Sequence, residues 1–143
     1  MISIKKRLFL ILFMMLTMTA KAQITFPELD VKMKREPKNI VIFISSERCA
    51  YCLMQEKRLK NNHTLNGRLN SEVYFVAWKV DEQKKIIFNG KPYISGMEFI
   101  REFNKGETGF PFWIVFDKNY QVVYTYAGLM QNSSLMKMLD AVQ

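Results

Sequence analysis

Cysteine and histidine are scarce in this chain of 143 residues, which contains two Cys and one His. The two cysteines, Cys49 and Cys52, are three positions apart, and a pair this close cannot cross-link a whole fold. Small secreted domains held together by a disulfide framework are therefore excluded. One Cys-x-x-Cys pair supplies only half of a zinc site, and His63 is most simply a solvated surface residue. We expect no metal ion.

Positive charge is also modest once its distribution is considered. The net charge is +8, but four of the 21 basic residues lie in the first 22 positions, which leaves 17 basic and 13 acidic residues, or +4. A domain this mildly basic gives no support for a nucleic-acid partner. Hydrophobic residues make up 49% and charged residues 24% of the chain, as in ordinary globular proteins, and repeats and low-complexity segments are absent. We expect one folded domain.

The first 22 residues carry the three-part pattern of a secretory signal peptide. The basic cluster K-K-R at 5–7 precedes an unbroken apolar run at 8–16, and A-K-A at 20–22 fits a small-x-small cleavage site. The alternative is an uncleaved membrane anchor, but an anchor needs about 20 apolar residues and this segment is much shorter. We predict cleavage after residue 22, a domain over 23–143, no stable membrane insertion and a periplasmic or secreted location.

The rest of the chain alternates between helical and strand patterns. The expected elements are a short helix ending before Pro37, a strand at 40–44, a helix at 49–60, a turn or two of helix around Leu65, a strand at 73–80, a short strand at 86–88, a helix from Ser95, strands at 112–116 and 121–127, and a C-terminal helix. A helix separates the first two long strands, so they should be parallel, whereas a tight turn makes the last two antiparallel. This order predicts an α/β sandwich with a mixed sheet and helices on both faces.

The segment Cys49-Ala50-Tyr51-Cys52 follows a buried strand and opens a helix, a context that makes Cys-x-x-Cys a redox signal. Free N–H groups and the positive end of the helix dipole favour a thiolate on Cys49, and Arg48 adds a positive charge. Cys52 lies one turn further on and can close an intrachain disulfide. The predicted reaction is thiol–disulfide exchange, in which Cys49 attacks and Cys52 resolves the mixed disulfide.

Two further interpretations of the pair compete with a redox role. An inert structural disulfide is disfavoured because a loop this small restricts the unfolded chain very little. Two plain core cysteines are disfavoured by an oxidising compartment.

The motifs, in this order, resemble the thioredoxin superfamily over about 28–142. The features that carry the resemblance are the strand at 40–44, C-A-Y-C at 49–52, the strand ending V-D at 80–81, G-F-P at 109–111 before F-W-I-V-F-D, and Gly128. The resemblance implies a thioredoxin-like three-layer sandwich and a cis bond between Phe110 and Pro111 beside the disulfide, and only X–Pro bonds adopt cis at low cost. It also implies that the backbone of Phe110 pairs with an extended substrate segment. Exported bacterial thiol-disulfide oxidoreductases are the most similar group.

Five positions depart from the thioredoxin pattern. Arg48 replaces the usual Trp, Phe43 the usual buried acid and Ala77 the usual buried Lys, and Ala-Tyr stands between the cysteines in place of Gly-Pro. Tyr51 matches the tyrosine of the glutaredoxin motif, which makes it a candidate for substrate binding. Without the buried acid, Glu47 is the candidate to take the proton of Cys52 through water.

The predicted function is an exported thiol-disulfide oxidoreductase with protein thiol or disulfide substrates and a membrane or soluble electron partner. The redox-active disulfide would serve without any cofactor. Arg48 predicts a reduction potential above the value of about −270 mV for thioredoxin. The alternative is a non-catalytic module with a locked disulfide that binds extended polypeptides at Phe110, Pro111 and an aromatic rim; for the aromatics that follow in the strand, a place in the core is the simpler interpretation.

Overall fold

The computed structural model describes Ile4 and residues 23–82 and 84–143 of the chain. The predicted signal peptide and its cleavage site therefore lie outside the described residues, Ile4 apart. In the described part, no helix is both long and apolar enough to cross a bilayer.

The centre of the molecule is a mixed sheet of four strands. They are β1 (Ile40–Ser45), β2 (Tyr74–Lys79), β5 (Phe112–Phe116) and β6 (Val122–Ala127), in the order β2-β1-β5-β6. The pair β1·β2 is parallel, and the pairs β1·β5 and β5·β6 are antiparallel. All residues of β1 and β5 are buried, because helices or loops cover both faces of these central strands. The predicted parallel pair and antiparallel hairpin are both confirmed.

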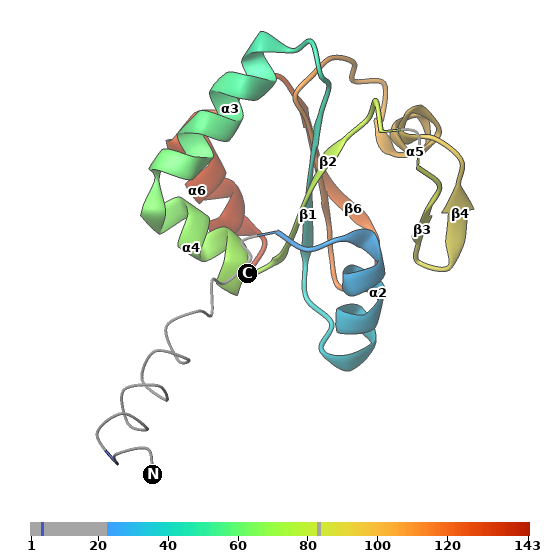
Figure 1. The fold of residues 1–143 in the computed structure, drawn as a ribbon, viewed down its shortest axis with the longest axis horizontal. Coiled ribbons are helices and arrows are strands. Elements are labelled where there is room, and N and C mark those ends of the chain that lie inside the picture. The colour runs from blue at the N-terminus through green and yellow to red at the C-terminus, as the bar shows by residue number, and fades with distance from the viewer. Residues whose placement is uncertain (1–3, 5–22, 83) are drawn as a thin grey trace.

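Five described helices flank this sheet. They are α2 (Phe26–Arg35), α3 (Ala50–Asn61), α4 (His63–Ser71), α5 (Gly96–Phe103) and α6 (Asn132–Ala141). Figure 1 shows α3, α4 and α6 on one side of the sheet and α2 and α5 on the other, which makes three layers. The predicted helices on both faces are therefore confirmed.

Local sequence sets where α2 and α4 begin. The Thr25 hydroxyl accepts a hydrogen bond from the Glu28 N–H, and the Glu28 carboxylate accepts one from the Thr25 N–H, which together form a capping box. Asn62 caps α4 by accepting the Leu65 N–H at 3.0 Å. His63 is the first residue of α4. His63 is exposed.

A second, two-stranded sheet covers part of the face that carries α2 and α5. It pairs β3 (Ile86–Phe88) with β4 (Lys91–Tyr93) across the turn Asn89-Gly90. The sequence predicted β3 but not β4, although Asn-Gly is typical of a hairpin turn. Ile86, Phe88 and Tyr93 are buried, so the hairpin supplies side chains to the core.

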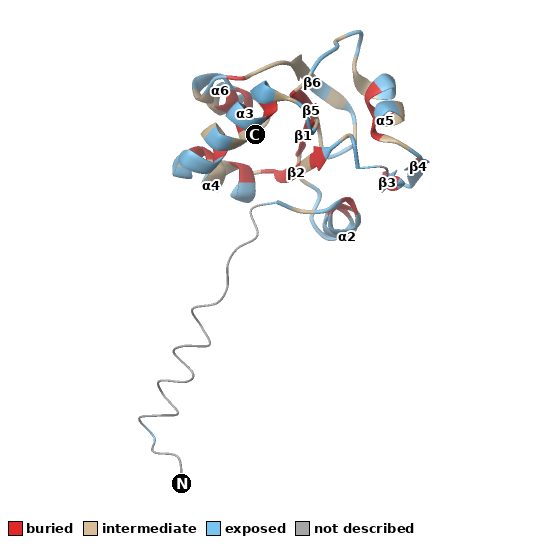
Figure 2. Cartoon of the chain, turned by 45° about the horizontal axis from the view of Figure 1, so that its top comes forward, coloured by how far each residue is buried: buried red, intermediate tan, exposed pale blue. Residues whose placement is uncertain are grey.

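The hydrophobic core is divided into two clusters, one on each face of the sheet. Figure 2 shows the buried residues gathered along the strands and on the helix sides that face them. Within β5, Phe112 and Phe116 belong to one cluster and Trp113 to the other, because neighbouring strand residues point to opposite faces. All three are buried, which confirms their interpretation as core residues.

Candidate active site

Three chain segments meet at one edge of the central sheet. Ile44 at the end of β1 pairs with Phe112 at the start of β5, and Phe112 pairs with Ala127 at the end of β6. This register brings together the loop after β1, the residues before β5 and the residues after β6. The Gly128 N–H donates a hydrogen bond to the Pro111 carbonyl at 2.7 Å. The predicted site residues all lie in these segments or in the first turn of α3.

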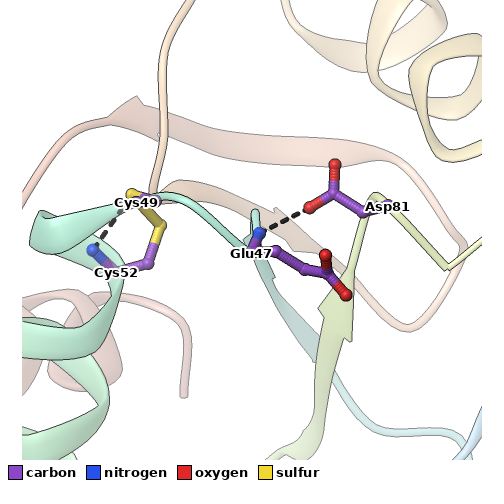
Figure 3. Close-up of a disulfide and its surroundings, with 4 residues drawn as sticks. All are labelled: Glu47, Cys49, Cys52 and Asp81. Atoms are coloured by element: carbon purple, nitrogen blue, oxygen red, sulfur yellow. Dashed lines mark hydrogen bonds between the residues drawn. A yellow bond between two sulfur atoms is a disulfide. The ribbon is translucent and has the colours of Figure 1, made fainter.

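Cys49 is the N-cap residue of α3 and forms a disulfide with Cys52, with the two Cα atoms 5.2 Å apart. The Sγ atom of Cys49 accepts the Cys52 N–H at 3.1 Å (Figure 3). Cys49 is half-buried, whereas Cys52 is 1% exposed. The first turn of α3 contains no acidic residue, so no local carboxylate opposes the positive end of the helix. Because Cys49 is half-buried and Cys52 is almost completely buried, an attacking group can approach Cys49 but not Cys52.

Arg48 and Tyr51 lie on either side of Cys49 in the chain and face solvent. Arg48 is exposed, and Tyr51 is 61% exposed. Leu53 and Met54, in the next turn of α3, are also exposed apolar residues. The outer cysteine is thus surrounded in the chain by one cation and several apolar side chains that are not part of the core.

Phe110 and Pro111 precede β5 at the same edge. Their peptide bond is cis, the isomer that the resemblance implies. Pro111 is buried, and the half-buried Phe110 packs against the aromatic cluster of the core. Gly109 and Gly128 have φ values of 118° and 122°, a region that residues with a Cβ atom rarely adopt. Gly109 allows the chain to turn just before Phe110, and Gly128 allows it to turn after β6, where its N–H reaches the Pro111 carbonyl.

The buried acid that the thioredoxin pattern leads one to expect is replaced by aromatic packing. Phe43 stacks at a tilt on Trp113, with ring centroids 4.7 Å apart, and both side chains are buried. Phe43, Ala77 and Glu56 are among the residues that line a cavity of about 530 Å³ beside α3. Glu56 follows Cys52 by four positions, so the two residues lie on the same side of the helix.

Glu47, the proton acceptor suggested by the sequence, is exposed. Its backbone N–H donates to the carboxylate of Asp81, two residues after the end of β2. In Figure 3 the Glu47 side chain extends away from the disulfide and toward Asp81. The geometry gives this residue a role in joining two loops, with its carboxylate directed away from the cysteines.

One residue of the site was missed by the sequence analysis. Gln55 lies in α3 one turn after Cys52 and is fully buried. Its side chain forms two hydrogen bonds with the backbone of Met130, which lies between β6 and α6. A glutamine on the buried face of a helix is a local signal, but the partner, 75 residues away, could not be predicted.

Groups of three or more His, Cys, Asp or Glu that could hold a metal ion do not occur among the described residues. The disulfide is the reactive group at this edge of the sheet.

Comparison with known proteins agrees with this geometry. Residues 26–143 match the family model of a thioredoxin-like domain. The chain belongs to this thioredoxin-like family. No curated protein matches the sequence significantly.

Several solved structures share the fold. A thioredoxin from Thermus thermophilus superposes with a TM-score of 0.60 and 18% identity over 81% of this chain and 82% of that one. The germline-specific thioredoxin Deadhead from Drosophila melanogaster gives 0.58 and 17%, over 83% and 95% of the two chains. A thioredoxin-fold protein from Helicobacter pylori gives 0.55 and 17%, over 74% and 82%. These likenesses confirm the predicted thioredoxin-like three-layer fold.

Proposed function

We propose that this protein is an exported thiol-disulfide oxidoreductase that acts on protein thiols or disulfides. The observation that carries the proposal is the difference between the two sulfur atoms. Cys49 caps a helix and is accessible, whereas its disulfide partner Cys52 is buried one turn further on. Membership of the thioredoxin-like family supports the same chemistry.

The helix end favours an anionic sulfur on Cys49 once the disulfide is reduced. The Cys52 N–H already points to this sulfur, and the dipole of α3 places partial positive charge there. Arg48 adds a full charge next in the chain. The thiolate is the nucleophile in exchange, so these groups activate the outer cysteine.

In the reducing direction the reaction has two steps. The Cys49 thiolate attacks a client disulfide, a mixed disulfide forms, and the other client sulfur leaves as a thiolate. The Cys52 thiol then gives its proton to a base, and its sulfur attacks Cys49 Sγ. The Cys49–Cys52 bond forms and the second client sulfur leaves, so the client gains two electrons and this protein loses two. Oxidation of a client dithiol is the same sequence in reverse, and an electron partner must restore the starting state.

We also propose roles for the remaining site residues, which their positions support. Arg48 tunes the Cys49 sulfur, and Tyr51, Phe110 and Pro111 contact the client beside it. Phe110 precedes a strand of the sheet, so its backbone groups can pair with an extended client segment.

Export is supported by the signal-peptide pattern of residues 1–22, and cell fractionation with N-terminal sequencing of the mature protein tests it.

Two assays test the proposed activity, the reduction of insulin and the reactivation of scrambled ribonuclease. We expect the wild-type protein to be active in at least one of them and Cys49→Ser to be inactive in both. A wild-type protein inactive in both assays would instead support the alternative, a binding module with a locked disulfide.

A further inference from the structure

Gln55 is an unusual residue for the interior of this domain. Among the described residues, Ser45 and Gln55 are the polar side chains that are buried, and Gln55 is 0% exposed. It lies on the face of α3 that also buries Cys52 and Leu59. Burying an amide is unfavourable unless its donor and acceptor are both satisfied, so an apolar side chain would be the simpler choice here.

Both ends of the Gln55 amide are satisfied by a single residue. The Met130 N–H donates to Gln55 Oε1 at 2.7 Å, and Gln55 Nε2 donates to the Met130 carbonyl at 3.2 Å. Met130 is itself 2% exposed. The Gln55 amide therefore bonds the backbone of Met130 as a neighbouring β-strand would, because it accepts one hydrogen bond from that residue and donates one to it.

This pairing ties down the short segment 128–131 between β6 and α6. Gly128 is bonded to the Pro111 carbonyl, Met130 to Gln55, and the Gln131 side chain accepts a hydrogen bond from Arg58 at 3.2 Å. Two of the three attachments come from α3, the helix that begins at the disulfide, and the third comes from the residue that precedes β5. The segment thus connects the cysteine helix to Pro111.

We propose that Gln55 is a positioning residue for protein substrates. By holding Met130, it fixes segment 128–131 against α3 and so sets the distance between Cys49 and Pro111. An extended client contacts both of these residues, so its binding depends on that distance. A small disulfide needs only the Cys49 sulfur and does not sense this spacing. The inference rests on the proposed oxidoreductase function and assigns Gln55 a role in discriminating polypeptide clients from small disulfides.

The test compares wild type with Gln55→Met, which keeps the length of the side chain and removes both hydrogen bonds. Each variant is assayed with insulin and with an aromatic disulfide reagent such as 5,5′-dithiobis(2-nitrobenzoate), at a temperature where circular dichroism shows it folded. We expect KM for insulin to rise about tenfold, while the rate with the small disulfide changes by less than about twofold. A parallel loss in both assays, or no change in either, would overturn the proposal.

Two further variants separate positioning from stability. Gln55→Glu keeps the acceptor for the Met130 N–H and should restore part of the affinity for insulin. Leu59→Ala removes a buried side chain of the same helix but keeps both hydrogen bonds between Gln55 and Met130, so it should destabilise the fold while leaving KM for insulin unchanged. A rise in KM in Leu59→Ala equal to that in Gln55→Met would assign the effect to stability and refute the proposal.

Amide hydrogen exchange keeps this test separate from the proposed function. If the wild-type protein reacts with neither disulfide, the oxidoreductase proposal fails, yet the attachment of segment 128–131 can still be measured. We expect the Gly128 and Met130 amides to exchange at least about tenfold faster in Gln55→Met, with the amides of β1 unchanged. Equal exchange in the two proteins would show that Gln55 does not position the segment.

Discussion

The two faces of the central sheet are packed with different kinds of side chain. The face covered by α2, α5 and the β3–β4 hairpin is rich in aromatic rings, among them Phe26, Trp78, Phe88, Tyr93, Phe99 and Phe116. The face covered by α3, α4 and α6 is mostly aliphatic, with Leu59, Leu65, Leu69, Leu135 and Leu139 among its members. The disulfide belongs to α3 and therefore to the aliphatic face.

This difference follows from what each face has to hold. The β3 and β4 strands have three residues each, and so short a hairpin is marginal without packing. The ring of Phe88 fixes it by contacts with five others. The aliphatic face is built from three helices, and one of them presents the cysteines. We infer that the aromatic face contributes mainly stability and the aliphatic face carries the chemistry.

Removing Phe99 should test the aromatic face most severely. Phe99 is 0% exposed and contacts six other rings, those of Phe26, Trp78, Phe88, Tyr93, Phe103 and Phe116. Phe99→Ala should lower the free energy of unfolding by about 3–5 kcal/mol, as measured by urea denaturation. The exchange rate per folded molecule should stay unchanged, because Phe99 lies on the other face from the disulfide.

Leu135→Ala, at a fully buried position of the aliphatic face, is the matched control. It should lower the free energy of unfolding by about 2–5 kcal/mol. If Phe99→Ala instead reduced the exchange rate while leaving stability intact, the division of roles between the faces would be wrong.

Alkaline pH should also weaken the aromatic face. Burial, together with the Glu102 carboxylate, raises the pKa of Tyr93 above its ordinary value of 10.0. Above about pH 10 the unfolded chain releases this proton and the folded chain keeps it, so stability falls with rising pH by at most about 1.4 kcal/mol per pH unit. Tyr93→Phe should flatten this decline when urea midpoints are compared at pH 9, 10 and 11. An equally steep decline in the variant would contradict the assignment.

Arg48 should affect the chemistry without affecting the core. The interaction of an exposed charge with a nearby opposite charge contributes about 0.5–1 kcal/mol. For a two-electron couple, about 30 mV in reduction potential corresponds to 1.4 kcal/mol. Arg48→Gln should therefore lower the reduction potential by about 10–20 mV in a glutathione buffer, with the urea midpoint unchanged. The wild-type potential should lie above about −270 mV. A higher potential in the variant would show that Arg48 does not stabilise the thiolate.

The smallest expected change is a loss of stability at acidic pH, caused by a carboxylate on the aliphatic face. Hydrogen bonds from Arg68 and Gln143 lower the pKa of Glu72 below its ordinary value of 4.5. The stability that Glu72 provides is present above that value and is lost as the pH falls through the lowered pKa. Glu72→Gln should have a slightly lower urea midpoint than wild type at pH 7 and the same midpoint at pH 3. A difference that persists at pH 3 would point to a cause other than the ionised carboxylate.

The sequence predicted most of the fold because its main signals are local. The runs Ile40–Ile44 and Phe112–Phe116 are apolar without alternation, and both are strands buried on two faces. The spacing of Thr25 and Glu28 is typical of a helix start, and α2 begins directly after Thr25. The helix predicted from Ser95 is α5, which Ser95 caps, although the Glu98 carboxylate accepts the Ile94 N–H rather than that of Ser95.

The features that sequence reasoning missed depend on contacts distant in the chain. β4 has three residues and contains Pro92, so neither its length nor its composition indicates a strand; it forms because Tyr93 is buried against Phe99. The Gln55–Met130 pairing joins residues 75 positions apart. The Cys-x-x-Cys pair could be placed at a helix start, but the burial of Cys52 required the packed structure.

The most direct test of the exchange chemistry is the capture of a mixed disulfide. Purified Cys52→Ser and Cys49→Ser proteins, each reduced first, are mixed with a disulfide-containing polypeptide and analysed by non-reducing electrophoresis and mass spectrometry. We predict a covalent adduct through Cys49 in Cys52→Ser that dithiothreitol releases, and none in Cys49→Ser. An adduct that forms only through Cys52, or no adduct in either variant, would contradict the proposal that Cys49 is the attacking sulfur.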